Sequence, residues 1–213
     1  MSLLKIDFRT EDSINESIEA IADGFANRVA LQVNDALYRI VDFEFYLYSE
    51  HFKDPYTYRH SLQKEHGRLL LHASGMDITV GDGTNEGGIL IRSVVNLSTN
   101  DQPNGPINVK TKVLSHLYPL TDSNANTIKL MPTELKPAPI KATSTRRIGL
   151  RPKSADENEV FLKKPLRYIV WFSRKDLELK IDEKESALRC ALERGKIEAD
   201  KVEPILGYKP SWL

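Results

Sequence analysis

The longest alternating pattern in the chain runs from 36 to 48 and predicts a strand with one side buried. Its first face consists of Leu37, Arg39, Val41, Phe43, Phe45 and Leu47. Its second face consists of Tyr38, Ile40, Asp42, Glu44, Tyr46 and Tyr48. Two carboxylates among three tyrosines are unusual for a solvated surface. Side chains two residues apart on a strand lie roughly 6.5–7 Å apart, so Asp42 and Glu44 should interact.

A like charge in a partly desolvated wall raises one of the two pKa values, which prepares a carboxylate for proton transfer. The alternative interpretation is a solvated edge whose acids pair with lysines. The residues of this strand leave both interpretations open.

The rest of the pattern predicts an α+β protein. A helix is expected over 13–26, with Ser13 and Glu16 as a capping box, and a second one over 174–194, ended by Gly195. Strands are expected over 28–33, 68–80, 88–95 and 166–172, with a tight turn at Asn34-Asp35. A short helix is expected over 109–118, an irregular segment over 119–143 and a docked tail over 196–213.

Composition narrows the class of protein. The 213 residues, 40% hydrophobic and 28% charged, suit one soluble domain or a domain with an appendage. A single cysteine, Cys190, fits a reducing compartment, and neither a signal peptide nor a membrane span is evident, so a cytoplasmic protein is expected. Thirty basic and thirty acidic residues cancel, which weakens the case for DNA binding without forbidding a local basic stripe.

Three further groups carry candidate chemistry. The histidines at 51, 60, 66 and 72 lack the spacing of a metal site, so no metal and no cofactor are expected. Arg92, flanked by aliphatic residues, must reach solvent, pair with a carboxylate such as Glu44, or meet a phosphate. The concentrated positive charge is formed by Arg146, Arg147, Arg151 and Lys153, either a solvated loop or a contact to a phosphate backbone.

Five segments, in order, resemble the alkyladenine (3-methyladenine) DNA glycosylase family. They are IVDFEFY at 40–46, a histidine-containing loop, SGMD at 74–77, ILIR at 89–92, and RIGL at 147–150 followed by KPLRYIV at 164–170. The resemblance covers about residues 28–172. It implies a curved, mostly antiparallel sheet surrounded by helices in residues 1–173, with 174–213 as a C-terminal helical appendage packed on it.

The resemblance also implies roles for individual residues. Glu44 takes the place of the general base that activates water, Arg92 helps to hold that water, and Tyr46 and His60 bind the extruded base. Arg146, Arg147 and Arg151 would contact DNA. The implied reaction is hydrolysis of the N-glycosidic bond of a damaged purine, as in base excision repair, through an oxocarbenium-like state.

The sequence departs from the family at positions that handle DNA. Ser74 replaces the intercalating tyrosine, and Leu69 and Leu71 replace aromatic residues before it. Each lost stacking contact is worth about 1–3 kcal/mol per base. Two alternatives therefore stand beside a glycosylase-like hydrolase: a non-catalytic module that binds nucleic acid or a nucleotide, and a hydrolase of free modified nucleosides.

Overall fold

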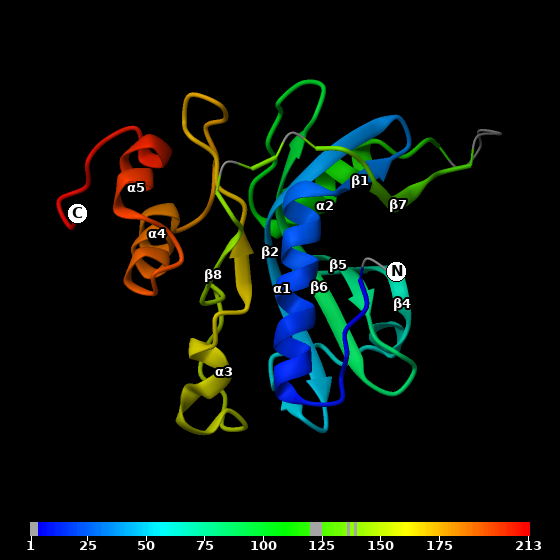
Figure 1. Ribbon diagram of the computed structural model, residues 1–213. Coiled ribbons are helices and arrows are strands. Elements are labelled where there is room, and N and C mark those ends of the chain that lie inside the picture. Colours follow the sequence, from blue (N-terminus) through cyan, green and yellow to red (C-terminus); the bar gives the residue numbers. More distant parts are fainter. Residues whose placement is uncertain (1–3, 120–124, 136, 139) are drawn as a thin grey trace.

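The structure, a computed structural model, describes residues 4–119, 125–135, 137–138 and 140–213. Its centre is a curled antiparallel sheet (Figure 1). The main path follows the order β4 (His66–His72), β5 (Gly75–Val80), β6 (Glu86–Asn96), β2 (Ala36–Ser49), β1 (Val29–Val33) and β7 (Ile128–Pro132). Off this path, β3 (Phe52–Lys53) and β9 (Arg167–Ile169) pair with β2, and β8 (Thr143–Thr145) pairs with β9. The α+β class and the antiparallel curvature expected from the sequence are confirmed.

Strand β2 is the central strand of the sheet, because it pairs with four others, β1, β3, β6 and β9. The alternation from 36 to 48 does form a strand, but both of its faces are covered. Phe43 and Phe45 pack with Tyr168 of β9 on one face, whereas Asp42 and Glu44 have no exposed surface on the other. The second face is therefore an interior surface rather than a solvated edge.

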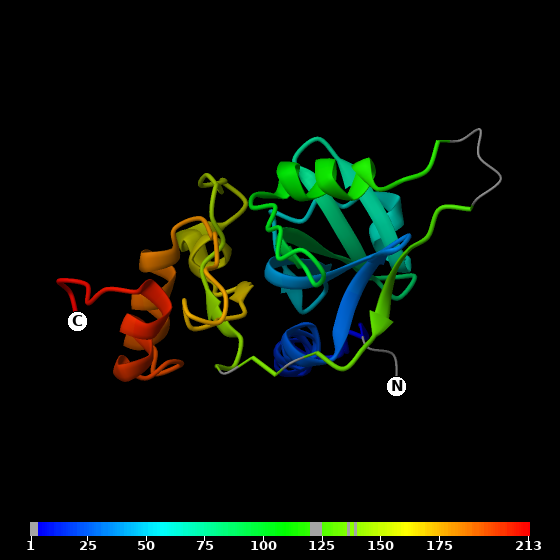
Figure 2. The same ribbon diagram turned by 90° about the horizontal axis from the view of Figure 1, so that it is seen from above.

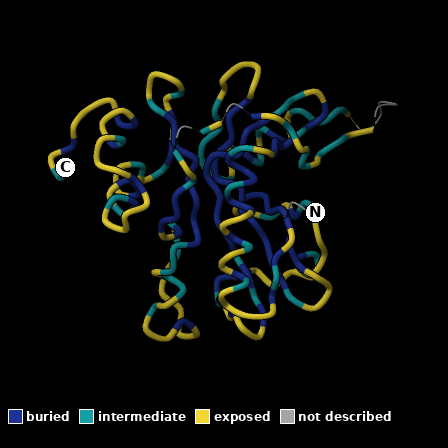
Figure 3. Tube along the Cα trace, viewed as in Figure 1, coloured by how far each residue is buried: buried dark blue, intermediate teal, exposed yellow. Residues whose placement is uncertain are grey.

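Two helices flank the sheet on opposite sides. Figure 2 shows α1 (Glu11–Asn27) beneath the strands and α2 (Pro106–Ser115) above them. The apolar stripe of α1 supplies Phe25, whose ring meets Phe43 edge-on at 5.0 Å between ring centroids. The buried residues concentrate where the strands and these helices meet (Figure 3). Short helical turns η1 (Ser61–Lys64), η2 (Glu157–Glu159) and α3 (Val160–Lys163) lie in the connections.

The C-terminal helices lie beside β8 at the edge of this body (Figure 1). They are α4 (Lys184–Glu193) and α5 (Ala199–Leu206), and Leu188, Val202 and Ile205 join the same hydrophobic core as the sheet. The tail thus docks as expected. The division into 1–173 and 174–213 stays a prediction.

Three local expectations were wrong. The capping box of the first helix is formed by Thr10 and Ser13, so the helix begins before Ser13. The helix expected over 174–194 occupies only its second half, because residues 174–176 and 182–183 form turns and residues 177–181 have no regular structure. Strand β7 lies within the segment expected to be irregular, where its pairing with β1 overrides a weak local pattern.

Candidate functional site

Glu44 lies in the middle of the sheet and is sealed from solvent. Its Oε2 accepts a hydrogen bond from the Tyr46 hydroxyl at 2.8 Å, and its Oε1 accepts one from the Ile148 N–H at 3.1 Å. The Arg92 Nη1 lies 3.4 Å from Oε1, and the exposed fraction of the Glu44 side chain is 0%. The sequence predicted the approach of Arg92 but not the contact with Ile148, and the carboxylate is sealed rather than open onto a hollow.

The surroundings of Glu44 favour its neutral form. Burial raises the pKa of Glu44 above its ordinary value of 4.5, Arg92 opposes this, and the nearby charge of Asp42 adds to it. Burial also raises the pKa of Tyr46 well above 10, so the tyrosine remains a hydrogen-bond donor toward Glu44. The interaction between the two carboxylates that was expected from their spacing is therefore present, but desolvation is the larger effect.

Asp42 is neutralised by a second arginine. Arg167 donates from Nε to Oδ1 at 2.8 Å and from Nη2 to Oδ2 at 2.7 Å, and both side chains are 1% exposed. Such bidentate geometry matches the planar guanidinium to the carboxylate. Asp42 and Glu44 are thus held by arginines from two different neighbouring strands, β9 and β6.

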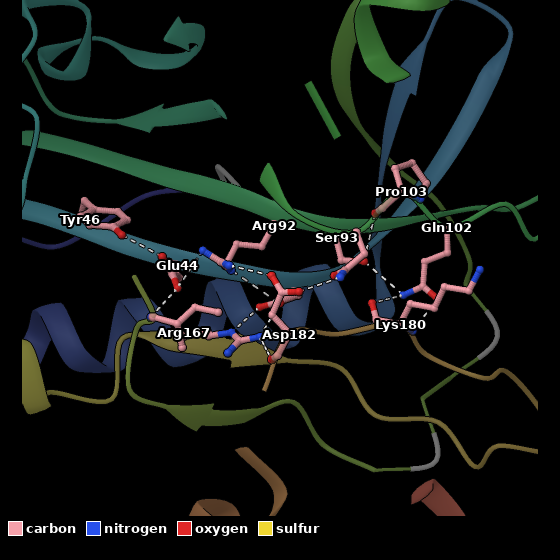
Figure 4. A network of polar contacts seen from close by, with 12 residues as sticks. Glu44, Tyr46, Arg92, Ser93, Gln102, Pro103, Arg167, Lys180 and Asp182 are labelled. Atoms are coloured by element: carbon pink, nitrogen blue, oxygen red, sulfur yellow. Dashed lines mark hydrogen bonds and ion pairs between the residues drawn. The ribbon is translucent and has the colours of Figure 1, made fainter. Parts of the chain in front are cut away.

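Arg92 joins these groups to the C-terminal segment. In addition to its contact with Glu44, Arg92 has its Nε 3.8 Å from Asp42 Oδ2. Its Nη2 donates to Asp182 Oδ2 at 3.1 Å. Figure 4 shows Asp182 between Arg92 and Arg167. We call Asp42, Glu44, Arg92, Arg167 and Asp182 the buried charge network. The expected pairing of Arg92 with Glu44 is therefore present, and the same arginine also reaches two more acids.

The loop before α4 is held against this network by hydrogen bonds to a second loop. Gln102 donates from Nε2 to the Lys180 carbonyl oxygen at 3.0 Å and accepts from the Lys180 N–H at 2.9 Å. Asn104 donates to Asp182 Oδ1 at 2.9 Å. Figure 4 shows Gln102 next to Ser93 and Pro103, and its Nε2 also donates to the Ser93 hydroxyl oxygen at 3.1 Å. Two loops far apart in sequence therefore cover the end of the network.

The basic segment expected to contact DNA divides into buried and exposed members. Arg147 is buried, with its Nη1 2.6 Å from Asp54 Oδ2 and 3.0 Å from the Phe45 carbonyl oxygen, and it stacks over the Tyr46 ring. Its assignment to a DNA-facing surface is corrected, because an arginine paired inside the protein cannot reach a phosphate backbone. Arg146 and Arg151 remain exposed.

A second polar region lies on the same face of the sheet as Glu44. The register aligns Asp77, Leu90, Glu44 and Arg167 in one row across four strands, and paired residues share a face. Asp77 is 4% exposed and accepts from Gln63 Nε2 at 3.3 Å, and its Oδ1 lies 3.1 Å from His72 Nε2. Sequence reasoning included Asp77 in the SGMD segment of the family resemblance but assigned it no role.

His72 contacts Asp77 of this row and also the exposed ring of Tyr58. The Tyr58 ring, 64% exposed, is near-parallel to the imidazole of His72 at 5.8 Å and to that of His60 at 6.2 Å between ring centroids. His60 is itself fixed, because its Nδ1 accepts from the Leu62 N–H at 3.1 Å. We call Tyr58, His60 and His72 the stacking surface. Sequence reasoning proposed His60 but missed Tyr58, whose position depends on how the loop returns to β4.

The positions that depart from the glycosylase pattern lie in β4 and in the turn that follows it, close in sequence to His72. Ser74 is exposed in the turn between β4 and β5, Leu71 is 44% exposed, and Leu69 is half-buried. Residues 73–75 of this turn are alanine, serine and glycine, so no large ring projects from them.

The described part of the chain offers neither a membrane span nor a metal centre. Within it, no helix combines the length and apolar character that a bilayer crossing requires. The same residues contain no group of three or more histidine, cysteine, aspartate or glutamate side chains arranged to hold a metal ion.

Comparison with known proteins does not assign the chain to a family. No family model matches the chain. The chain is similar to uncharacterized protein L759 of Acanthamoeba polyphaga mimivirus, with 31% identity over 128 residues. This match covers 49% of this chain and 57% of the viral protein, so the chain spans little more than half of that relative.

Proposed function

We propose that this chain is a non-catalytic module that binds an unpaired nucleobase, in a nucleotide or a single strand, at the stacking surface. The observation that carries the proposal is the exposed ring of Tyr58, held near-parallel to two imidazoles. Aromatic and histidine rings are the platforms on which unpaired bases stack, at about 1–3 kcal/mol per base. An exposed aromatic ring aligned by its neighbours needs little ordering when a ligand arrives.

Polar groups beside the rings would orient the base. His72 is held by Asp77, and Asp77 by Gln63, so the imidazole keeps a fixed orientation. Arg59, exposed next to Tyr58 in the chain, lies over the Tyr48 ring and pairs with Glu86 at 2.9 Å. These contacts support recognition of a base with hydrogen-bonding edges in preference to a purely apolar ligand.

The state of Glu44 argues for binding without hydrolysis. A general base must come within hydrogen-bond reach of the water that it deprotonates. Both oxygens of Glu44 already accept hydrogen bonds from the protein, and its side chain has no exposed surface. In this form, a water molecule would have to displace Tyr46 or the chain at Ile148.

A second candidate is the glycosylase-like hydrolase, favoured by the convergence of Glu44, Arg92 and Ile148 from three distant segments. The resemblance to alkyladenine DNA glycosylases implies this arrangement, with damaged DNA as the partner. If Tyr46 turned away and Glu44 were ionised, its carboxylate could take a proton from water as the oxygen bonds to the sugar carbon, while the N-glycosidic bond breaks and the purine leaves with the bonding electrons. A free modified nucleoside could be cleaved in the same way.

Binding and base release, measured on the same protein, separate these candidates. We expect fluorescence anisotropy to show salt-dependent binding of a labelled single-stranded oligonucleotide and no release of base from alkylated DNA or modified nucleosides. Tyr58→Ala should weaken binding by about 5- to 150-fold, the equivalent of one lost stacking contact. Tyr208→Ala serves as the matched control, because Tyr208 is 50% exposed on the distant end of α5.

Each outcome selects one candidate. Base release by the wild-type protein that is lost in Glu44→Gln would establish the hydrolase and remove the non-catalytic proposal. Equal weakening by Tyr58→Ala and Tyr208→Ala would show that the stacking surface is not the binding site.

A further inference from the structure

A cavity of about 410 Å³ lies between the β8–β9 pair and α4. Its sheet side is formed by Thr145, Arg146 and Arg167, and its helix side includes Glu183, Ser186, Arg189 and Glu193. We call this cavity the arginine pocket. Nothing in the family resemblance assigns a ligand to it, and its inference does not rest on the function of the stacking surface.

Arg167 presents an unused donor to the arginine pocket. Its Nε and Nη2 are engaged by Asp42, and Nη2 also donates to the Asp182 carbonyl oxygen at 2.8 Å. Its Nη1 has no hydrogen-bond partner in the part of the chain that the structure describes. Since Arg167 lines the pocket and Asp42 holds its guanidinium in place, we infer that Nη1 is the donor that a ligand there would use.

Arg146 and Thr145 add donors next to it. The exposed Arg146 has no ion pair among the described residues, in contrast to Arg189, which lies 3.0 Å from Glu193. Thr145 is directly opposite Arg167 in the register of β8 and β9, and is 3% exposed. One free guanidinium, one fixed N–H and one hydroxyl therefore meet at the sheet side of the pocket.

We propose that the arginine pocket binds the phosphate group of a small molecule, with a nucleoside monophosphate as the ligand class. Guanidinium groups bind phosphate through paired N–H donors, and hydroxyl groups complete such sites. A volume of about 410 Å³ lies in the range of small-molecule pockets. Glu183 and Glu193, on the opposite side, would accept hydrogen bonds from sugar hydroxyls or base amino groups.

Titration of the full chain tests this inference. We expect AMP to bind, by calorimetry, more tightly than inorganic phosphate, and sodium acetate at the same ionic strength not to bind. Arg146→Glu should weaken AMP binding at least tenfold. The matched control is Arg151→Glu, which changes another exposed arginine of the same segment outside the pocket, and it should leave affinity within twofold.

A second variant guards against a general charge effect. Thr145→Val removes only a hydroxyl and should weaken AMP severalfold with the wild-type circular dichroism spectrum. Equal affinity for phosphate and AMP would overturn the nucleoside monophosphate as the ligand class, because the site would then recognise the phosphate group alone. Acetate binding as tight as phosphate, or equal losses in Arg146→Glu and Arg151→Glu, would overturn the proposal.

Discussion

The buried charge network and the stacking surface lie on one face of one sheet, yet they differ in how many of their polar groups and rings a ligand could reach. In the network, Glu44 and Asp42 accept hydrogen bonds from protein donors and are hidden from water. On the stacking surface, Tyr58 is mostly exposed, and only the groups beneath it are held in place. The difference shows that a carboxylate of the right type on the right strand does not predict activity, because access and spare hydrogen-bonding capacity decide what a site can do.

The largest expected effect is a loss of stability when an ion pair of the buried charge network is broken. Arg167→Ala would leave Asp42 as a buried charge with its main partner removed, because Arg92 approaches Asp42 only to 3.8 Å. Removal of one member of such a pair destabilises a protein by about 3–5 kcal/mol. We expect this loss in the free energy of unfolding measured by urea denaturation at neutral pH.

A double variant sharpens this test. Asp42→Leu together with Arg167→Met removes both charges and should recover most of the stability, since uncharged pairs of similar volume can replace buried ion pairs. A single variant as stable as the wild-type protein would show that the network is hydrated in solution and is not a closed structural unit.

A smaller effect is expected at the junction between the two regions. A Cβ atom at Gly88 would lie 2.7 Å from Gln63 Nε2 and 2.8 Å from Asp77 Oδ2, too close for either side chain to stay in place. Gly88→Ala should cost about 1–3 kcal/mol of stability and weaken ligand binding at Tyr58, because Asp77 no longer positions His72. Thermal unfolding and anisotropy measure the two consequences.

Gly24→Ala is the matched control for this variant. A Cβ atom at Gly24, inside α1, meets nothing within 4 Å, so alanine should stabilise the helix by about 0.5–1 kcal/mol. Normal binding by Gly88→Ala would mean that Asp77 and His72 do not act on the stacking surface.

The pH dependence of stability tests the state of Glu44. Because its pKa is raised in the folded protein, Glu44 contributes stability below the ordinary value of 4.5, and this contribution is lost as pH rises through the folded pKa. The stability of the wild-type protein should therefore fall relative to that of Glu44→Gln as pH rises above 4.5, in urea denaturation series. Each tenfold increase in the affinity of the folded carboxylate for its proton adds about 1.4 kcal/mol to this difference. The opposite trend would show that Arg92 holds Glu44 ionised.

The sequence predicted those parts of the structure that depend on local pattern. The alternation in β2 and the spacing in α1 were strong enough to place the strand and the helix, and the apolar flanks of Arg92 indicated a partner such as Glu44. Whether Glu44 would be open could not be predicted, because the seal depends on the rotamer of Tyr46 and on Arg92, which the loop before α4 contacts through Asp182.

The charged segment at 146–151 shows the same limit. Arg146 and Arg147 are adjacent in sequence, but only Arg147 meets a buried partner, Asp54, and that pairing is set by tertiary contacts. Similarly, β7 forms because β1 offers a free edge, although its own sequence is a weak strand pattern.

The smallest expected effect distinguishes the two regions most directly. Tyr58→Ala should change the free energy of unfolding by less than about 0.5 kcal/mol, because the ring is 64% exposed and contributes little to the core. The same variant should lose most single-strand binding, whereas Arg167→Ala should lose stability first. Urea denaturation and anisotropy on both variants therefore give a crossed pattern if recognition and stability are divided between the two regions. A Tyr58→Ala variant that loses stability and binding in proportion would instead make the ring a structural part of its loop, because the binding loss would then follow from unfolding.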